Sequence, residues 1–100
     1  MPPWRAARLG PALGTWDPKK DLLNQRDHDI TLQEATTVFG DALAITVSDP
    51  DHSMDEERFI TIGQSSSGRL LVVCHIEQGD TIRIISARRA TARERKDYET

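Results

Sequence analysis

The stretch RFITIGQSSSGRLLVVCHIEQGDTIRIISA, residues 58–87, decides the fold of this chain. Apolar and β-branched residues concentrate in three runs, at residues 57–63, 69–76 and 81–87. Short segments with glycine, SSSG at 65–68 and QG at 78–79, separate the runs and are typical of tight turns. The pattern predicts an antiparallel β-meander. Because the middle run is apolar on both alternating sides, we expect a central strand that helices cover on one side.

Alternation along the strands predicts which side chains share a face of the sheet. Arg58 shares its side with the two isoleucines of its own run. Arg83 points away from Ile82 and Ile84. If the last strand extends to Arg88, strict alternation places that residue on the side of the two isoleucines, opposite to Arg83.

Upstream of the meander the sequence predicts a helix from Pro18 to about Asp27. Asp17 can accept hydrogen bonds from the first backbone N–H groups, and Pro18 has the backbone angle that the first helical position requires. We expect this helix to bury Leu22 and Leu23. A short edge strand or extended lead-in precedes it, near residues 13–16.

Two further helices are predicted from capping boxes, in which a Thr and a Glu three residues later satisfy each other's backbone groups. Residues 31–34 open a second helix with apolar residues at helical spacing, which Gly40 ends. Residues 91–94 open a C-terminal helix that reaches about Tyr98. Residues 42–47 are expected to form a strand.

These elements predict one α+β domain at residues 13–100, with a small antiparallel sheet of about four strands, two N-terminal helices and one C-terminal helix. Residues 1–12 are rich in Pro, Ala and Arg without periodicity, and we expect a flexible N-terminal extension. No run approaches the ~18 apolar residues of a membrane span. The N-terminus lacks the apolar stretch of a secretory signal, so we expect a cytoplasmic protein that does not contact membranes.

The formal net charge of -3 weighs against a dedicated nucleic-acid-binding protein, because phosphate contacts dominate such affinity. The charge is unevenly distributed, however. Residues 49–57 hold five acids and no Lys or Arg, whereas residues 83–97 hold six bases and two acids. A local field that attracts phosphate is therefore compatible with an acidic protein, although a solvated helix face would explain much of the same basic run.

The remaining candidates for chemistry are few. Cys74 is the single cysteine and lies in an apolar run, which indicates a small core residue and excludes a cysteine zinc cluster. The acidic loop at 49–57 lacks the spacing of a calcium loop, so we interpret it as solvated and expect no metal site. His75 is interpreted as a packed sheet residue and His52 as a loop residue. His28, at the turn between two helices, fits either a helix-capping cation or an acid–base group.

Hydrolysis of RNA by its own 2′-OH needs a base, an acid and cations that stabilise the phosphate in the transition state. Histidine and arginine can share these tasks without a metal ion. Arginines on neighbouring strands, about 4.8 Å apart, can converge on one face and bind phosphate. Salt bridges to Glu56, Glu57 and Glu77 are an equally open explanation for the same arginines.

Three segments of the chain resemble the BrnT family of toxins. They are WDPKK…N…H with EA…VF at 16–39, DPDHS…DEER…IG…SGR at 49–69, and RIISAR…AT…ER…Y at 83–98. The resemblance spans residues 13–98 and implies a RelE-like fold and a metal-independent, cofactor-free ribonuclease that inhibits translation. It also implies an antitoxin of the BrnA type, a ribbon-helix-helix protein that neutralises the toxin in a heterotetramer. Operator DNA would be contacted through that antitoxin alone.

The family's polar positions fall on seven residues of this chain: Lys20, Asn24, His28, Arg58, Arg83, Ser86 and Arg88. The resemblance implies that His28 takes part in acid–base catalysis. It implies that the three arginines stabilise the phosphate and the transition state. The other three residues would contact the RNA.

The chain departs from the family where Asp27 and Asp29 flank His28, in place of Lys and Gly. Two acids are expected to repel phosphate at close range, and Asp29 has to adopt a left-handed conformation that glycine takes freely. The alternative function is a non-catalytic, toxin-like module that binds an antitoxin and acts with it as a transcriptional co-repressor. The net acidity of the chain would suit a basic partner.

Overall fold

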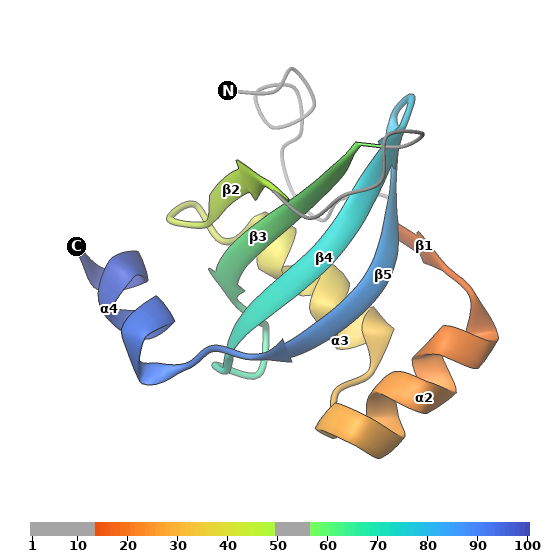
Figure 1. Ribbon diagram of the computed structural model, residues 1–100, viewed down its shortest axis with the longest axis horizontal. Coiled ribbons are helices and arrows are strands. Elements are labelled where there is room, and N and C mark those ends of the chain that lie inside the picture. The colour runs from red at the N-terminus through yellow and green to blue at the C-terminus, as the bar shows by residue number, and fades with distance from the viewer. Residues whose placement is uncertain (1–13, 50–56) are drawn as a thin grey trace.

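The computed structural model describes residues 14–49 and 57–100 (Figure 1). Along the chain the elements are β1 (Gly14–Trp16), α2 (Pro18–His28), α3 (Leu32–Thr36), a 3₁₀ helix η1 (Thr37–Gly40), β2 (Ile45–Ser48), β3 (Arg58–Gln64), β4 (Leu70–Gln78), β5 (Thr81–Arg89) and α4 (Ala92–Glu99). The strands form one sheet in the order β1-β5-β4-β3-β2. The predicted extension at residues 1–12, His52 and most of the acidic loop lie outside the described residues.

The three central strands form the predicted meander. β3 pairs antiparallel with β4, and β4 pairs antiparallel with β5. Gly68 and Gly79 lie in the two connecting turns with φ angles of 85° and 62°, which glycine adopts without strain. The prediction of three strands joined by glycine-containing turns is confirmed.

The sheet differs from the expectation in number and direction of strands. It has five strands instead of about four, and it is mixed, because β1 pairs in parallel with β5. The lead-in forms β1 because its backbone groups can bond to the edge of β5. β2 starts at Ile45 instead of residue 42, since Asp41 forms a turn in which its carboxylate accepts the N–H of Leu43 at 2.9 Å. The RelE-like character of the fold stays a prediction.

Helix α2 begins as predicted but faces the sheet differently. Asp17 accepts a hydrogen bond from the N–H of Lys19 at 2.9 Å. The expectation that Leu22 and Leu23 are buried is wrong, because they are 68% and 48% exposed. The buried residue of α2 is Asn24, and residues next to it in a helix point about 100° away. A polar amide therefore sets which side of α2 contacts the sheet.

The second predicted helix is divided into α3 and the 3₁₀ helix η1. Thr31 caps α3 by accepting the N–H of Glu34 at 3.0 Å. The Glu34 carboxylate does not complete a capping box, since it binds the guanidinium of Arg69 and the hydroxyls of Ser65 and Ser67. Arg69 lowers the pKa of Glu34 to about 2. These contacts fix the turn between β3 and β4 to α3.

The core lies between the sheet and α3, which covers the back of the sheet in Figure 1. The buried cluster consists of Ile30, Leu32, Ala35, Val38, Leu71, Val73, Ile82, Ile84 and Ala87. His75 is fully buried beside it, with its Nε2 2.8 Å from the hydroxyl of Thr61. Burial lowers the pKa of His75 to about 4. The prediction of a packed sheet histidine is confirmed.

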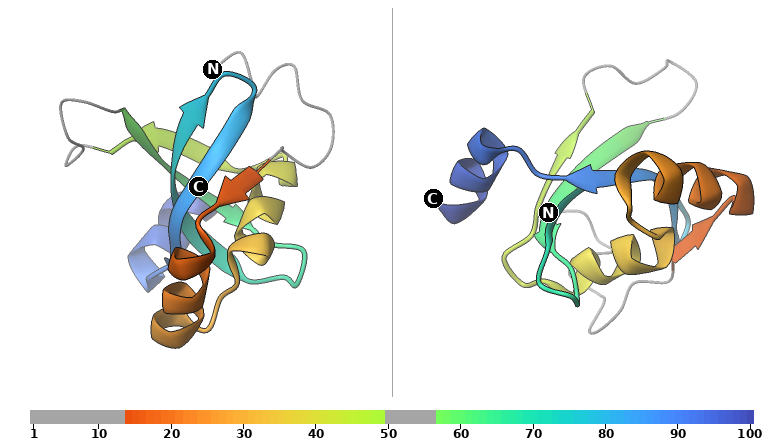
Figure 2. Two further views of the ribbon diagram at one scale, coloured as in Figure 1. Left: turned by 90° about the vertical axis from the view of Figure 1, so that its right-hand side faces the viewer. Right: turned by 90° about the horizontal axis from the view of Figure 1, so that it is seen from below.

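Helix α4 opens with the predicted capping box, formed by Thr91 and Glu94. It leaves the end of β5 and lies on the side of the molecule away from α2 (Figures 1 and 2). None of its residues is buried. Among the described helices, none is long and apolar enough to cross a membrane.

Candidate active site

A register shift in β5 decides which arginines share a face. Cys74 lies opposite Ser86, whereas the next residue of β4, His75, lies opposite Ile84. Ile85 is therefore an extra residue without a partner on β4, which is the definition of a β-bulge.

The bulge overturns the expectation from strict alternation. Arg83 and Arg88 lie opposite Ile76 and Val72 of β4, which are four positions apart and therefore share a face. Ala87 is 1% exposed and belongs to the core cluster on the other face. Arg88 thus lies on the same face as Arg83, not on the opposite face with Ile82 and Ile84.

Arg58 and Arg83 flank the same residue of β4. Ile76 pairs with Arg58 on one side and with Arg83 on the other, so the two arginines are two strand spacings apart, roughly 10 Å at the backbone. Both line one pocket of about 180 Å³ together with Lys20 of α2. The lining is completed by Ile76, Gln78 and Ile85, and it includes no acidic residue among the described ones. We call this pocket the cationic end.

A second pocket of about 170 Å³ adjoins the cationic end, because Lys20 and Ile85 line both. Its lining is Lys20, Leu23, Asn24, Asp27, His28, Ile85 and Ser86. Lys20, Asn24 and His28 are spaced by four residues along α2, which places them on one side of the helix.

Asn24 fixes this side of α2 against β5. Its Nδ2 donates to the carbonyl of Ile30 at 2.9 Å, and its Oδ1 accepts the N–H of Ala87 at 3.0 Å. The Asn24 side chain is only 5% exposed. These contacts give Asn24 a positioning role, since they hold α2 next to the strand that carries Arg83 and Ser86.

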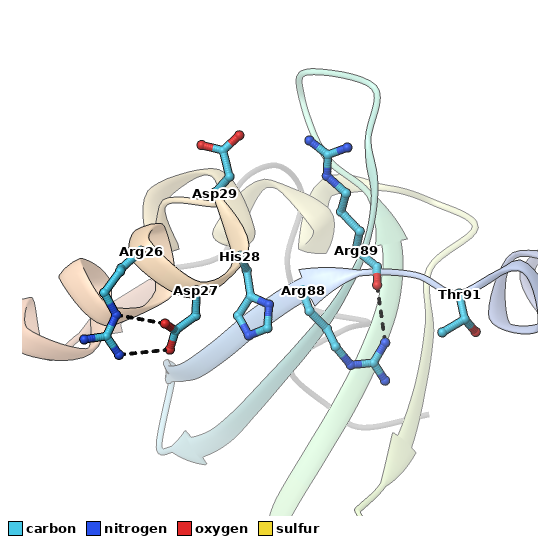
Figure 3. A pocket seen from close by; sticks show the side chains of 7 residues that line it. All are labelled: Arg26, Asp27, His28, Asp29, Arg88, Arg89 and Thr91. Carbon is cyan, nitrogen blue, oxygen red and sulfur yellow. Dashed lines mark hydrogen bonds and ion pairs between the residues drawn. The ribbon is translucent and has the colours of Figure 1, made fainter.

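A third pocket, of about 660 Å³, continues from the second because Asp27 and His28 line both. Figure 3 shows its lining residues Arg26, Asp27, His28, Asp29, Arg88, Arg89 and Thr91. We call this pocket the compensated end, because two of its arginines are paired with carboxylates. Arg26 Nε lies 2.9 Å from Asp27 Oδ1, and Arg88 binds both carboxylate oxygens of Glu94 at 2.8 Å.

Asp29 follows His28 and ends helix α2. Its φ and ψ of 57° and 38° are left-handed, and its N–H donates to the carbonyl of Gln25 at 3.0 Å. The expectation that Asp29 takes a conformation suited to glycine is confirmed. The helix therefore ends directly beside His28, and the exposed imidazole faces the compensated end (Figure 3).

All seven residues singled out by sequence line this chain of pockets, and their roles stay predictions. Sequence reasoning missed Leu23, Ile85 and Arg89, which also line it. Arg88 has a salt bridge to Glu94, which is not one of the three glutamates considered, and Glu56 lies outside the described residues. The fold of α4 sets that pairing, so only the tertiary structure could reveal it.

The remaining candidates give little chemistry. Cys74 is half-buried, and burial, followed by the charge of Asp49, raises the pKa of its thiol. A raised pKa lowers the reactivity of a thiol. The described residues contain no group of three or more His, Cys, Asp or Glu that could hold a metal ion.

Among known proteins, a family model and a solved structure are similar to this chain. The family model described as "Ribonuclease toxin, BrnT, of type II toxin-antitoxin system" matches residues 16–94. The crystal structure of the Brucella abortus ribonuclease toxin BrnT is similar in fold, with a TM-score of 0.57 and 19% identity over 80% of this chain and 99% of that chain. No curated protein matches the sequence.

Proposed function

The chain belongs to the BrnT family of ribonuclease toxins from type II toxin–antitoxin systems, and we propose that the groove formed by the three pockets is where it cleaves RNA. The observation that carries the proposal is the cationic end. Three positive side chains from α2, β3 and β5 line one small pocket there. The pocket with His28 adjoins it.

The cationic end would bind the phosphate to be cleaved. Arginine donates paired N–H groups that match phosphate oxygens, and lysine adds a compact charge. Arg58 and Arg83 approach the pocket from opposite sides of Ile76, so one phosphate between them can be bound by both. Their charge would stabilise the negative charge that develops on the phosphate in the transition state.

His28 would transfer protons in this reaction. Its exposed imidazole lies at the boundary between the second pocket and the compensated end. A histidine there can remove the proton of the 2′-OH or protonate the leaving oxygen. The Ser86 hydroxyl in the same pocket would bind the RNA, and Lys20 would attract it.

Membership of a type II system implies an antitoxin partner. We further propose that this antitoxin is a ribbon-helix-helix protein that forms a heterotetramer with the toxin and contacts operator DNA for both. RNA cleavage by the free toxin would block translation in the cytoplasm. The chain would use no cofactor and no metal ion.

Expression of the chain alone and with a candidate antitoxin from an adjacent reading frame tests the proposal. We expect growth arrest and cleaved cellular RNA without the antitoxin, and recovery with it. Purified protein should cleave RNA in EDTA as it does in magnesium. If growth continues and RNA stays intact while the protein is folded, the ribonuclease proposal is rejected.

A second candidate function is partner binding without catalysis. Two observations favour it: the carboxylate that binds Arg88, and the two acids that flank His28. A folded chain that binds its antitoxin and represses the shared promoter, but leaves RNA intact, would establish this alternative. Cleavage that Arg83→Ala abolishes would exclude it.

A further inference from the structure

The Glu94 carboxylate accepts three hydrogen bonds, two of which join α4 to the groove. Its two carboxylate oxygens accept one N–H each from Nη1 and Nη2 of Arg88, both at 2.8 Å. Oε1 also accepts the N–H of Thr91 at 2.8 Å, as part of the capping box. The Arg88 guanidinium lowers the pKa of Glu94 to about 2, so the carboxylate stays charged at neutral pH.

Few other contacts with the described part of the chain hold α4 in place. The helix has no buried residue, so little apolar area stabilises its position. At its last turn the Tyr98 hydroxyl donates to Asp41 Oδ2 at 2.5 Å. Among the described residues, the helix is thus attached mainly through one polar contact at each end, the paired Arg88–Glu94 contact and the Tyr98–Asp41 hydrogen bond.

A guanidinium fork that holds one carboxylate through both Nη atoms presents the same edge that a phosphate would use. The Arg88 side chain is 44% exposed and lines the compensated end. An anion in this pocket could therefore reach the guanidinium from solvent. An RNA phosphate at this pocket would therefore compete with the Glu94 carboxylate for one set of donors.

We propose that Glu94 is a positioning residue that withholds Arg88 from RNA, so that binding of a phosphate by Arg88 requires Glu94 to release the guanidinium. The inference rests on the proposed function, because it concerns the same groove. Its consequence is that the protein binds RNA through the cationic end first. The first turn of α4 then sets how strongly the compensated end adds to the affinity.

The test measures binding of the full chain to a 2′-O-methyl oligoribonucleotide, which cannot be cleaved by 2′-OH attack. Glu94→Gln keeps an oxygen to accept the Thr91 N–H but removes the charge that holds Arg88. We expect affinity to rise on the order of tenfold, as for one added charged contact. The slope of log affinity against log salt should steepen by about one phosphate contact. Asp97→Asn removes the same charge from an exposed site on the same helix and is the matched control.

A double-variant cycle with Arg88→Ala separates the specific effect from a general change of charge. The gain from Glu94→Gln should disappear when Arg88 is absent. A gain that persists without Arg88, or one equal to that of Asp97→Asn, overturns the proposal. A purely structural role for Glu94 would lower the melting temperature and leave the salt slope unchanged. If the unsubstituted chain binds no RNA, the proposed function itself fails. This result can be told apart from the others, because each of them requires that the unsubstituted chain binds RNA.

Discussion

The two ends of the groove contain similar basic residues but differ in what surrounds them. At the cationic end, Lys20, Arg58 and Arg83 share a pocket whose described lining has no acid. At the compensated end, Arg26 and Arg88 are each paired with a carboxylate. The difference teaches that the number of arginines in a segment does not locate a phosphate site. The balance of charge within each pocket does, and it depends on the tertiary structure.

The largest effect should come from removing a cation at the cationic end. Arg83→Ala is expected to lower the rate of RNA cleavage by roughly 10²–10³, the loss typical of one group that stabilises transition-state charge. Arg26→Ala, at the compensated end, should lower it by much less because Asp27 already offsets that charge. Single-turnover cleavage of a defined RNA measures both variants.

Arg95→Ala, on the exposed side of α4, is the control for net charge, and thermal unfolding shows whether each variant is folded. Equal losses of activity for Arg83→Ala and Arg26→Ala would contradict the distinction between the two ends.

The next effect concerns Asn24, whose hydrogen bonds hold α2 against β5 between the two ends of the groove. Asn24→Ala would leave the carbonyl of Ile30 and the N–H of Ala87 without their partner. We expect the free energy of unfolding to fall by about 3 kcal/mol, because each unsatisfied buried group costs on the order of 1–3 kcal/mol. Urea unfolding measures the loss, with Gln25→Ala as an exposed control on the same helix. A loss below that of the control would rule out this anchoring role.

A smaller effect is the pH dependence that His75 contributes from the far side of the sheet. Burial lowers its pKa from the ordinary 6.5 to about 4, so the unfolded chain binds a proton in this window that the folded chain does not. The stabilising contribution is complete above pH 6.5 and is lost as pH falls toward 4. At pH 5 the loss is roughly 2 kcal/mol.

Urea unfolding at pH 7 and pH 5 checks this, and His75→Gln should flatten the dependence between them. An unchanged slope in that variant would show that another group is responsible. The outcome bears on the groove, since a fall in cleavage at acidic pH must be corrected for unfolded protein before it is assigned to any group of the groove.

The smallest effect is expected at Asp29, where the compensated end meets the end of α2. Asp29→Gly should raise the free energy of unfolding by about 0.5–1 kcal/mol, because glycine adopts the left-handed conformation without strain. It also removes one acid beside His28, so RNA binding should strengthen slightly. Asp29→Ala removes the same charge but keeps a side chain in the left-handed region, and thermal unfolding should rank it below Asp29→Gly. The reverse ranking would contradict the strain argument.

The sequence predicted those helix ends and turns that depend on residues close together in the chain. The Asp17 cap, the turns at Gly68 and Gly79 and the capping box of α4 each depend on residues a few positions apart, and the structure has them. The exposure of Leu22 and Leu23 could not be predicted. It follows in part from a hydrogen bond of Asn24 to Ala87 in β5, 63 positions away.

The candidate site shows the same division. The resemblance to a family identified seven positions, and all of them line the groove. Which arginines share a face depended on one extra residue in β5, and the pairing of Arg88 with Glu94 depended on where α4 lies. Neither is encoded in the spacing of charges along the chain.

The bulge at Ile85 also determines what kind of genetic change this strand tolerates. Substitutions in β5 alter one side chain at a time and leave the alternation of the others intact. Deletion of a single codon at the bulge would restore strict alternation, so the two parts of the strand could no longer both keep their present faces. If the first part kept its face, Arg88 would turn toward the core and Ala87 toward solvent. A change in the length of β5 is therefore expected to disturb the core and the groove together, whereas most substitutions in β5 would not.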